Sequence, residues 1–83
     1  MSTPRHTVIL YTKPGCHLCE AVEQVIRKVA ARHPFDYIPR NIESDPADYE
    51  TYKDDIPVVT VNGVEIARHR MTAAQLEREL ARR

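Results

Sequence analysis

The chain has 83 residues, of which 42% are hydrophobic and 6% aromatic, which is enough for one small domain and too few for two. Its 12 Lys and Arg residues balance 12 Asp and Glu residues, so a net charge of zero offers no general attraction for nucleic acid or acidic lipid. No apolar run approaches the length of a membrane span or of a signal-peptide core. We therefore expect one soluble, cytoplasmic, monomeric domain over residues 1–83, with neither a nucleic-acid nor a membrane partner.

The N-terminal third predicts a strand followed by a long helix. Residues 6–11 are rich in β-branched and aromatic side chains, and the unbroken apolar run Val8-Ile9-Leu10 is typical of a central strand covered on both faces. Residues 12–15 have turn chemistry. Apolar side chains at helical spacing then predict a helix from His17 to about His33, where the following proline stops it.

The middle of the chain predicts a second strand and a short helix. Residues 35–42 have strand character, and Pro39 places that strand at a sheet edge because proline cannot donate a ladder hydrogen bond. A strand-helix-strand crossover is nearly always right-handed, so the first two strands should be parallel. Ser44-Asp45-Pro46 offers an N-cap and a first-turn proline for a helix from Ala47 to about Lys53.

The C-terminal third predicts a hairpin and a last helix. Strands over residues 57–61 and 64–67 are joined by Asn62-Gly63, a pair that supplies the positive φ angles of a two-residue turn. Thr72 and Gln75 form a capping box at the start of the last helix, which runs to the C-terminal arginines. The expected element order is β-α-β-α-β-β-α, without internal repeats or linkers.

The two cysteines, Cys16 and Cys19, lie where the first turn becomes the first long helix. Unpaired N–H groups and the helix dipole stabilise negative charge at that end, so Cys16 is the expected nucleophile in its thiolate form. Cys19 lies one turn further on the same side of the helix and is the expected resolving thiol, more buried than Cys16. Lys13 and His17 should favour the thiolate and outweigh the opposing charge of Glu20.

A pair with this spacing supports two kinds of chemistry. In the redox interpretation, the Cys16 thiolate attacks a substrate disulfide, and Cys19 then attacks the mixed disulfide and releases the reduced substrate. In the alternative interpretation, the pair supplies half of a tetrahedral zinc site in an interaction module. That site would need two further ligands from the four histidines, and His17 is too close to the cysteines to serve easily. We favour redox chemistry and expect no metal.

Ile56-Pro57 opens the expected third strand. A trans peptide bond is the default for such a pair. A cis bond would expose the N–H and C=O groups of Ile56, which could then pair with an extended substrate beside Cys16.

Residues 11–19 (YTKPGCHLC) and residues 55–59 (DIPVV) resemble the glutaredoxin family, specifically small bacterial glutaredoxin-like proteins of the thioredoxin fold. The resemblance covers essentially the whole chain, residues 1–83, as one glutaredoxin-like domain. It implies an α/β, thioredoxin-like fold of glutaredoxin type, with a four-stranded mixed sheet flanked by helices and the first strand central. It also implies that Cys16 is the nucleophile and Cys19 the resolving thiol, that Ile56 and a cis Pro57 pair with a substrate strand, and that Lys13 faces a carboxylate of glutathione.

Two departures from the family pattern concern specificity. Glutathione-using members commonly carry a glycine pair after the fourth strand, but residues 67–72 contain none. Arg68 and Arg70 either hold a substrate carboxylate there or lie in a solvated loop, which we favour. The residues between the cysteines, His17-Leu18, are usual for neither glutaredoxins nor thioredoxins, so a reduction potential anywhere from about −270 to about −180 mV is compatible with the sequence.

We conclude that the sequence predicts a cytoplasmic thiol–disulfide oxidoreductase that reduces protein disulfides or glutathione mixed disulfides. It would hold no tightly bound cofactor, take glutathione as a co-substrate, and be regenerated by glutathione or by a thioredoxin-reductase-type donor. The first alternative is an iron–sulfur cluster carrier, in which Cys16 from two subunits and two glutathione thiols ligate the cluster. The second alternative is the zinc-binding interaction module.

Overall fold

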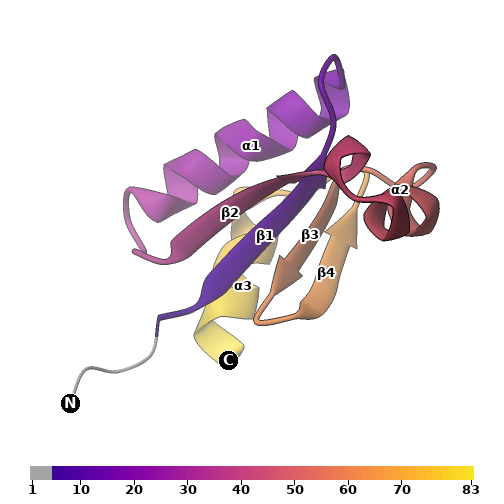
Figure 1. Cartoon of the computed structure of the whole chain (residues 1–83). Helices are drawn as coiled ribbons and strands as arrows, with labels where there is room; N and C mark the ends of the chain where they lie inside the picture. The colour runs from indigo at the N-terminus through magenta and orange to yellow at the C-terminus, as the bar shows by residue number, and fades with distance from the viewer. Residues whose placement is uncertain (1–4) are drawn as a thin grey trace.

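The computed structural model describes residues 5–83, so the first four residues of the predicted domain lie outside the described part (Figure 1). The chain forms a four-stranded mixed sheet and three α-helices in the predicted order, which confirms the α/β, thioredoxin-like fold class. One short 3-10 helix, η1, was not predicted. Within the described residues, none of the helices has the length and apolar character needed to cross a bilayer. The elements are β1 (Thr7–Thr12), α1 (His17–Ala30), β2 (Asp36–Asn41), η1 (Ile42–Ser44), α2 (Pro46–Tyr52), β3 (Val58–Val61), β4 (Val64–Arg68) and α3 (Ala73–Arg82).

The strand order across the sheet is β2-β1-β3-β4. β1 pairs in parallel with β2 and antiparallel with β3, and β4 completes the sheet as an antiparallel neighbour of β3. The central position of β1 and the edge position of β2 are both confirmed. Pro39 is paired in register with Leu10 on this edge strand. Proline has no N–H group, and the outer side of an edge strand has no neighbouring strand that would need one.

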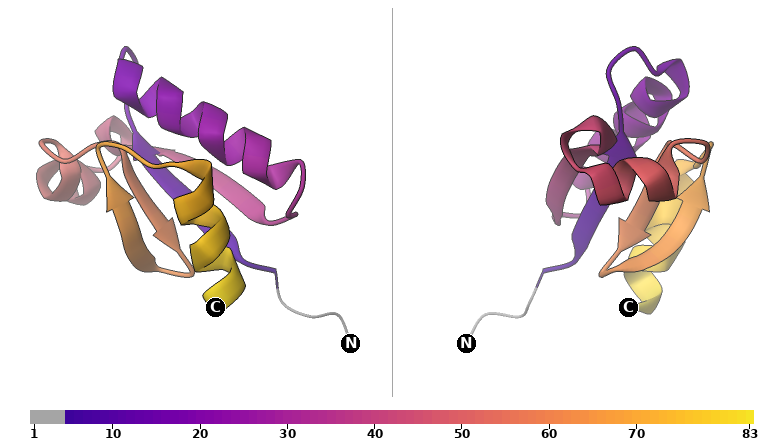
Figure 2. Two further views of the ribbon diagram at one scale, coloured as in Figure 1. Left: turned by 180° about the vertical axis from the view of Figure 1, so that it is seen from behind. Right: turned by 45° about the vertical axis from the view of Figure 1, so that its right-hand side comes forward.

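Helices α1 and α3 cover the same face of the sheet, as the view from behind shows (Figure 2). Val8 and Leu10 of β1 point into this layer and are fully buried, whereas Ile9 between them is only half-buried. The prediction that β1 is covered on both faces is therefore wrong over part of its length, because the short α2 lies only at the end of β1. The main core consists of Val8, Leu10, Val22, Ile26, Val29, Phe35, Val59, Val61, Ala67, Met71, Leu76 and Leu80.

Several element boundaries differ from the prediction by a residue or more, among them the ends of the first helix and of the second strand. α1 ends at Ala30 instead of about His33, and the N–H groups of Arg32 and His33 both donate to the carbonyl of Val29 in a closing turn. The α conformation is disfavoured for the residue before a proline, so the helix ends before it reaches His33, which precedes Pro34. The second strand stops before Ile42, which instead begins η1 and is fully buried.

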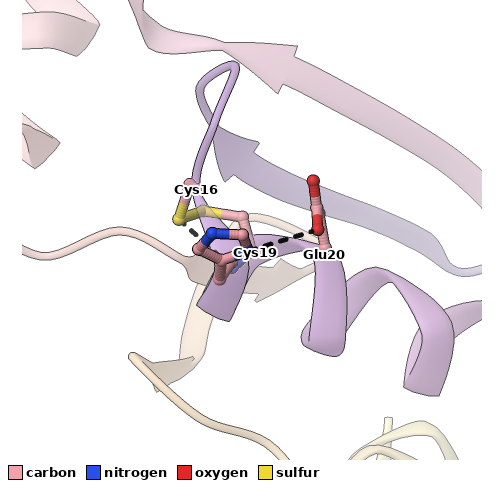
Figure 3. The surroundings of a disulfide bond; sticks show 4 residues. Cys16, Cys19 and Glu20 are labelled. Carbon is pink, nitrogen blue, oxygen red and sulfur yellow. Dashed lines mark hydrogen bonds and ion pairs between the residues drawn. A yellow bond between two sulfur atoms is a disulfide. The ribbon is translucent and has the colours of Figure 1, made fainter.

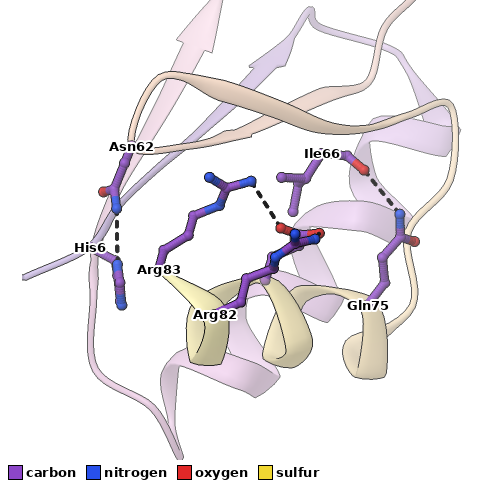
Figure 4. A network of polar contacts seen from close by, with 7 residues as sticks. His6, Asn62, Ile66, Gln75, Arg82 and Arg83 are labelled. Atoms are coloured by element: carbon purple, nitrogen blue, oxygen red, sulfur yellow. Dashed lines mark hydrogen bonds and ion pairs between the residues drawn. The ribbon is translucent and has the colours of Figure 1, made fainter.

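The hairpin turn also fixes the start of β1. Asn62 and Gly63 have φ values of 53° and 85°, as the Asn-Gly pair predicted. The Asn62 backbone N–H donates to the Thr7 carbonyl at 2.9 Å, and the Asn62 side-chain oxygen accepts the Thr7 N–H at 2.9 Å. The side-chain amide of Asn62 contacts His6 as well (Figure 4). The turn between β3 and β4 therefore holds the strand at the centre of the sheet.

The N-terminus of α3 is capped in part as expected. The Thr72 hydroxyl accepts the Gln75 N–H at 3.1 Å. The Gln75 side chain does not complete a capping box, because it donates instead to the carbonyl of Ile66 at 3.0 Å (Figure 4). Ile66 lies where the pairing of β3 and β4 shifts register, so this hydrogen bond attaches α3 to the irregular part of β4.

Candidate functional site

Cys16 is the N-cap residue of α1, the position that the sequence predicted. Its backbone is extended, with φ −94° and ψ 106°, and its carbonyl accepts the first helical hydrogen bond from Glu20 at 3.1 Å. Its sulfur accepts the N–H of Cys19 at 3.1 Å (Figure 3). An N-cap acceptor satisfies one of the free N–H groups at a helix start, so this sulfur lies where negative charge is best stabilised.

The two cysteines form a disulfide, with Cα atoms 5.2 Å apart. Their environments differ, because Cys16 is half-buried whereas Cys19, in the first turn of α1, is only 2% exposed. A substrate sulfur can therefore reach Cys16 from solvent but cannot reach Cys19. Cys19 is therefore the more buried of the two, as the sequence predicted.

Lys13 and His17, the two residues expected to favour the thiolate, lie in different surroundings. Lys13 is exposed and lines a cavity of about 290 Å³ beside both cysteines. His17 points into solvent, with its side chain 96% exposed, and its ring lies 3.7 Å from the Glu20 carboxylate. Because both side chains are exposed, the effect of this pair on a neighbouring thiolate is screened by solvent. Of the two residues expected to favour the thiolate, Lys13 is the one that shares a cavity with Cys16.

The same cavity extends along α1 to a second carboxylate, Glu23. The Tyr37 hydroxyl of β2 donates to Glu23 Oε2 at 2.7 Å, and Arg27 lies 3.6 Å from the same oxygen. Burial, together with this hydrogen bond, raises the pKa of Tyr37 well above its usual range, so its hydroxyl remains a donor. The wall of this cavity thus combines one lysine with the carboxylates of Glu20 and Glu23.

A second cavity of about 380 Å³ lies on the other side of α1, between that helix and the segment that precedes α3. Leu18, which separates the two cysteines in sequence, is 44% exposed at this cavity. The lining carries no carboxylate, in contrast to the first cavity. It consists of Leu18, Ala21, Val22, Val25, His69, Arg70 and Met71.

The Ile56–Pro57 peptide bond is cis, as the family resemblance implied. The N–H of Ile56 donates to the carbonyl of Tyr52 at the end of α2, at 3.2 Å. This group is therefore already engaged, contrary to the expectation that both backbone groups of Ile56 face a substrate. Among the described residues, the Ile56 carbonyl has no hydrogen-bond donor. It is the group that remains for pairing with an extended chain.

Tyr52 was missed by the sequence analysis as part of the site. Its ring stacks on that of Tyr11 at the end of β1, with centroids 4.2 Å apart and planes inclined by 27°. Burial, and next the neighbouring Tyr11, raises the pKa of Tyr52. The stack holds α2 against the end of β1 and so fixes the carbonyl that accepts from Ile56. No periodic signal could have paired two tyrosines so far apart in sequence.

The two arginines after the fourth strand have different environments. Arg68 donates to both carboxylate oxygens of Glu65, at 2.7 and 2.8 Å, and lies 3.2 Å from Asp55. The hydrogen bonds from Arg68 lower the pKa of Glu65. Arg68 is thus solvent-exposed, as we favoured, but it ends β4 instead of lying in a loop, and it is already paired with carboxylates of the chain itself. Arg70 lies instead in the lining of the second cavity, beside α1.

His69, between these arginines, has a φ of 71°, a left-handed conformation that favours glycine. The Arg70 N–H donates to the Arg68 carbonyl at 2.8 Å and closes a tight turn around it. The chain therefore keeps a glycine-like backbone where the family's glycine pair is expected, although it has no glycine there. Among the described residues, no cluster of three or more His, Cys, Asp and Glu side chains is arranged to hold a metal ion.

The sheet order, the disulfide at the tip of the first helix and the cis-proline ahead of β3 define a domain of the thioredoxin fold that carries a cysteine pair. Residues 7–81 match the profile of the family described as "Glutaredoxin-like domain (DUF836)", and the chain therefore belongs to this glutaredoxin-like family. The family and the cysteine pair together support a redox role.

Solved structures similar to this chain share its fold. Protein Ne2328 from Nitrosomonas europaea is 21% identical, with a TM-score of 0.80 over 96% of each chain. A structural-genomics protein from X. campestris is 22% identical, with a TM-score of 0.77 over 92% of this chain and 97% of that one. A mutant thioredoxin from Halobacterium salinarum is 12% identical, with a TM-score of 0.72 over 95% of this chain and 74% of that one. At these identities the likeness shows the fold alone.

Proposed function

We propose that this protein is a thiol–disulfide oxidoreductase that reduces protein disulfides or glutathione mixed disulfides in the cytoplasm. The observation that carries the proposal is the position of the Cys16 sulfur, which is reachable from solvent and accepts an N–H at the tip of α1. Cys19 lies within disulfide reach and is sheltered from other sulfurs. This arrangement suits an exchange in which only one thiol meets the substrate.

The proposed reaction proceeds in two displacements. The Cys16 thiolate attacks one sulfur of the substrate disulfide, forms a mixed disulfide, and the departing substrate thiolate takes up a proton. Cys19 then loses its proton and attacks the Cys16 sulfur, which breaks the mixed disulfide and releases the second substrate thiolate. The substrate gains two electrons and two protons in total, and the Cys16–Cys19 disulfide is left. A dithiol donor or two glutathione molecules return both electrons to the pair.

Glutathione is a co-substrate in this proposal and not a resident cofactor. Lys13 is exposed on the cavity beside Cys16, which supports its contact with a glutathione carboxylate. The carboxylates of Glu20 and Glu23 in the same wall suit the amino group of the tripeptide. Lys13→Ala should therefore raise the KM for a glutathione mixed disulfide more than the KM for a protein disulfide.

Turnover of a peptide–glutathione mixed disulfide and of a protein disulfide by the wild type, Cys16→Ser and Cys19→Ser tests the proposal. Cys16→Ser should abolish both reactions, because no other thiolate can reach the substrate. Cys19→Ser should accumulate a mixed disulfide with the substrate, which mass spectrometry detects. Activity of Cys16→Ser equal to that of the wild type would refute the assignment. A redox titration of the pair against glutathione and against a dithiol buffer would then define the donor.

A further inference from the structure

Two consecutive residues at the end of β4 contact both sides of Ile56. The Arg68 guanidinium lies 3.2 Å from the carboxylate of Asp55, the residue before Ile56. The His69 N–H donates to the carbonyl of Pro57, the residue after Ile56, at 2.7 Å. We call Arg68 and the His69 backbone the β4 clamp.

The backbone of β4 brings the clamp to this position. Arg68 is the register partner of Val58, the first residue of β3, so it lies beside the point where the Ile56–Pro57 segment enters the sheet. The same register places the His69 N–H opposite the Pro57 carbonyl, to which it donates as the next ladder hydrogen bond of the antiparallel pair. The left-handed turn at His69 begins directly after this hydrogen bond.

A contact with Glu65 fixes the orientation of the Arg68 side chain relative to Asp55. Its Nε and Nη2 atoms donate to the two oxygens of Glu65, and this bidentate contact fixes the plane of the guanidinium. Nη1 is then left to contact Asp55. A lysine ammonium is a single point charge and cannot hold a bidentate contact with Glu65 while also reaching Asp55 in a fixed direction.

We propose that Arg68 is a positioning residue for peptide substrates, because the β4 clamp holds the Ile56 carbonyl in the place where an extended chain can donate to it. This inference rests on the proposed function, since it assigns the recognition of a peptide backbone to the same site. Arg68 itself touches neither the disulfide nor the substrate. It acts through Asp55, and its removal should affect substrates that offer a backbone while leaving the exchange chemistry intact.

The test compares two disulfide substrates, one that contains a peptide backbone and one that does not. One is a disulfide-linked pair of extended peptides, and the other is bis(2-hydroxyethyl) disulfide, which carries no amide groups. For Arg68→Ala we expect the KM for the peptide to rise about five-fold with kcat unchanged, which is the factor for losing one interaction of ordinary strength. The rate with the small disulfide should stay at the wild-type value. Arg68→Lys should restore the peptide KM only in part.

Arg78→Ala is the matched control, because it removes the same charge from an exposed position on α3. It should leave both substrates at wild-type values. An unchanged peptide KM in Arg68→Ala would overturn the proposal. An equal loss on both substrates would also overturn it, because Arg68 would then act on the cysteine pair or on the whole fold.

A second measurement does not depend on turnover. Hydrogen exchange of the His69 amide reports its hydrogen bond to Pro57 directly. We expect about five-fold faster exchange in Arg68→Ala than in Arg78→Ala, for the same reason as the change in KM. Unchanged exchange would overturn the clamp even if the wild type reduced no disulfide. Faster exchange in a protein without reductase activity would leave the clamp standing and refute only the proposed function.

Discussion

The two halves of the redox site are built in different ways. The half at the tip of α1 is local, because Cys16, Cys19 and their hydrogen bonds lie within one stretch of turn and helix. The half around Ile56 is assembled from distant parts, with Tyr52 of α2 on one side and, on the other, Arg68 of β4 and the His69 that follows it. The first half holds the groups that react, and the second holds a backbone carbonyl in place. Substitutions should therefore separate chemistry at the first half from substrate pairing and stability at the second.

The largest expected effect on stability comes from the tyrosine stack in the distant half. Tyr52→Ala removes a half-buried ring from Tyr11 and should lower the free energy of unfolding by about 2 kcal/mol. Chemical denaturation measures this loss. Tyr52→Phe keeps the ring and should retain most of the stability, so a full loss with phenylalanine would show that the hydroxyl matters and the stack does not.

The next effect separates the capping role of Cys16 from its reactivity. In the reduced proteins, Cys16→Ser keeps a side-chain acceptor for the Cys19 N–H, whereas Cys16→Ala removes it. We expect the free energy of unfolding of the alanine variant to be about 1 kcal/mol lower than that of the serine variant. Neither variant should reduce a disulfide. Equal stabilities, measured by thermal or denaturant unfolding, would argue against a capping contribution.

A smaller effect of opposite sign is expected in the distant half. His69 has a φ of 71°, which costs free energy for any residue with a Cβ atom. His69→Gly should keep the turn and the hydrogen bond to Pro57, and should stabilise the protein by about 0.5 to 1 kcal/mol. His69→Val, the control, should destabilise it. A loss of stability with glycine would mean that the histidine ring contributes more than the strained backbone costs.

The smallest effect depends on pH. The hydrogen bonds from Arg68 lower the pKa of Glu65 below its ordinary value of 4.5, so they stabilise the folded protein when Glu65 is ionised. This contribution is present above about pH 4.5 and is lost as the pH falls through the folded pKa. Glu65→Gln should therefore be less stable than the wild type at pH 7, and the difference should disappear in acid. A difference that does not change with pH would contradict the assignment. Salt should weaken it, because the pair is exposed.

The sequence by itself determined the elements and the local half of the site. Helical spacing after a turn, an Asn-Gly pair between apolar runs and the proline of an edge strand each depend on neighbouring residues, and the structure has these features. The cap at Cys16 belongs to the same group, because a helix start is specified by the few residues around it. Such features follow from backbone geometry and need no knowledge of what packs against them.

Only the tertiary structure decided the distant half. The tertiary structure placed α1 and α3 on the same face of the sheet, which leaves Ile9 half-buried. It also brought the Tyr52 carbonyl to the Ile56 N–H, which donates to it. It also decided which carboxylates Arg68 meets. A charged or aromatic side chain can reach many partners, and sequence separation does not determine which of them packing brings into contact. The register of β3 and β4 makes that choice, and the sequence pattern contains no signal for the irregularity near Ile66 that shifts it.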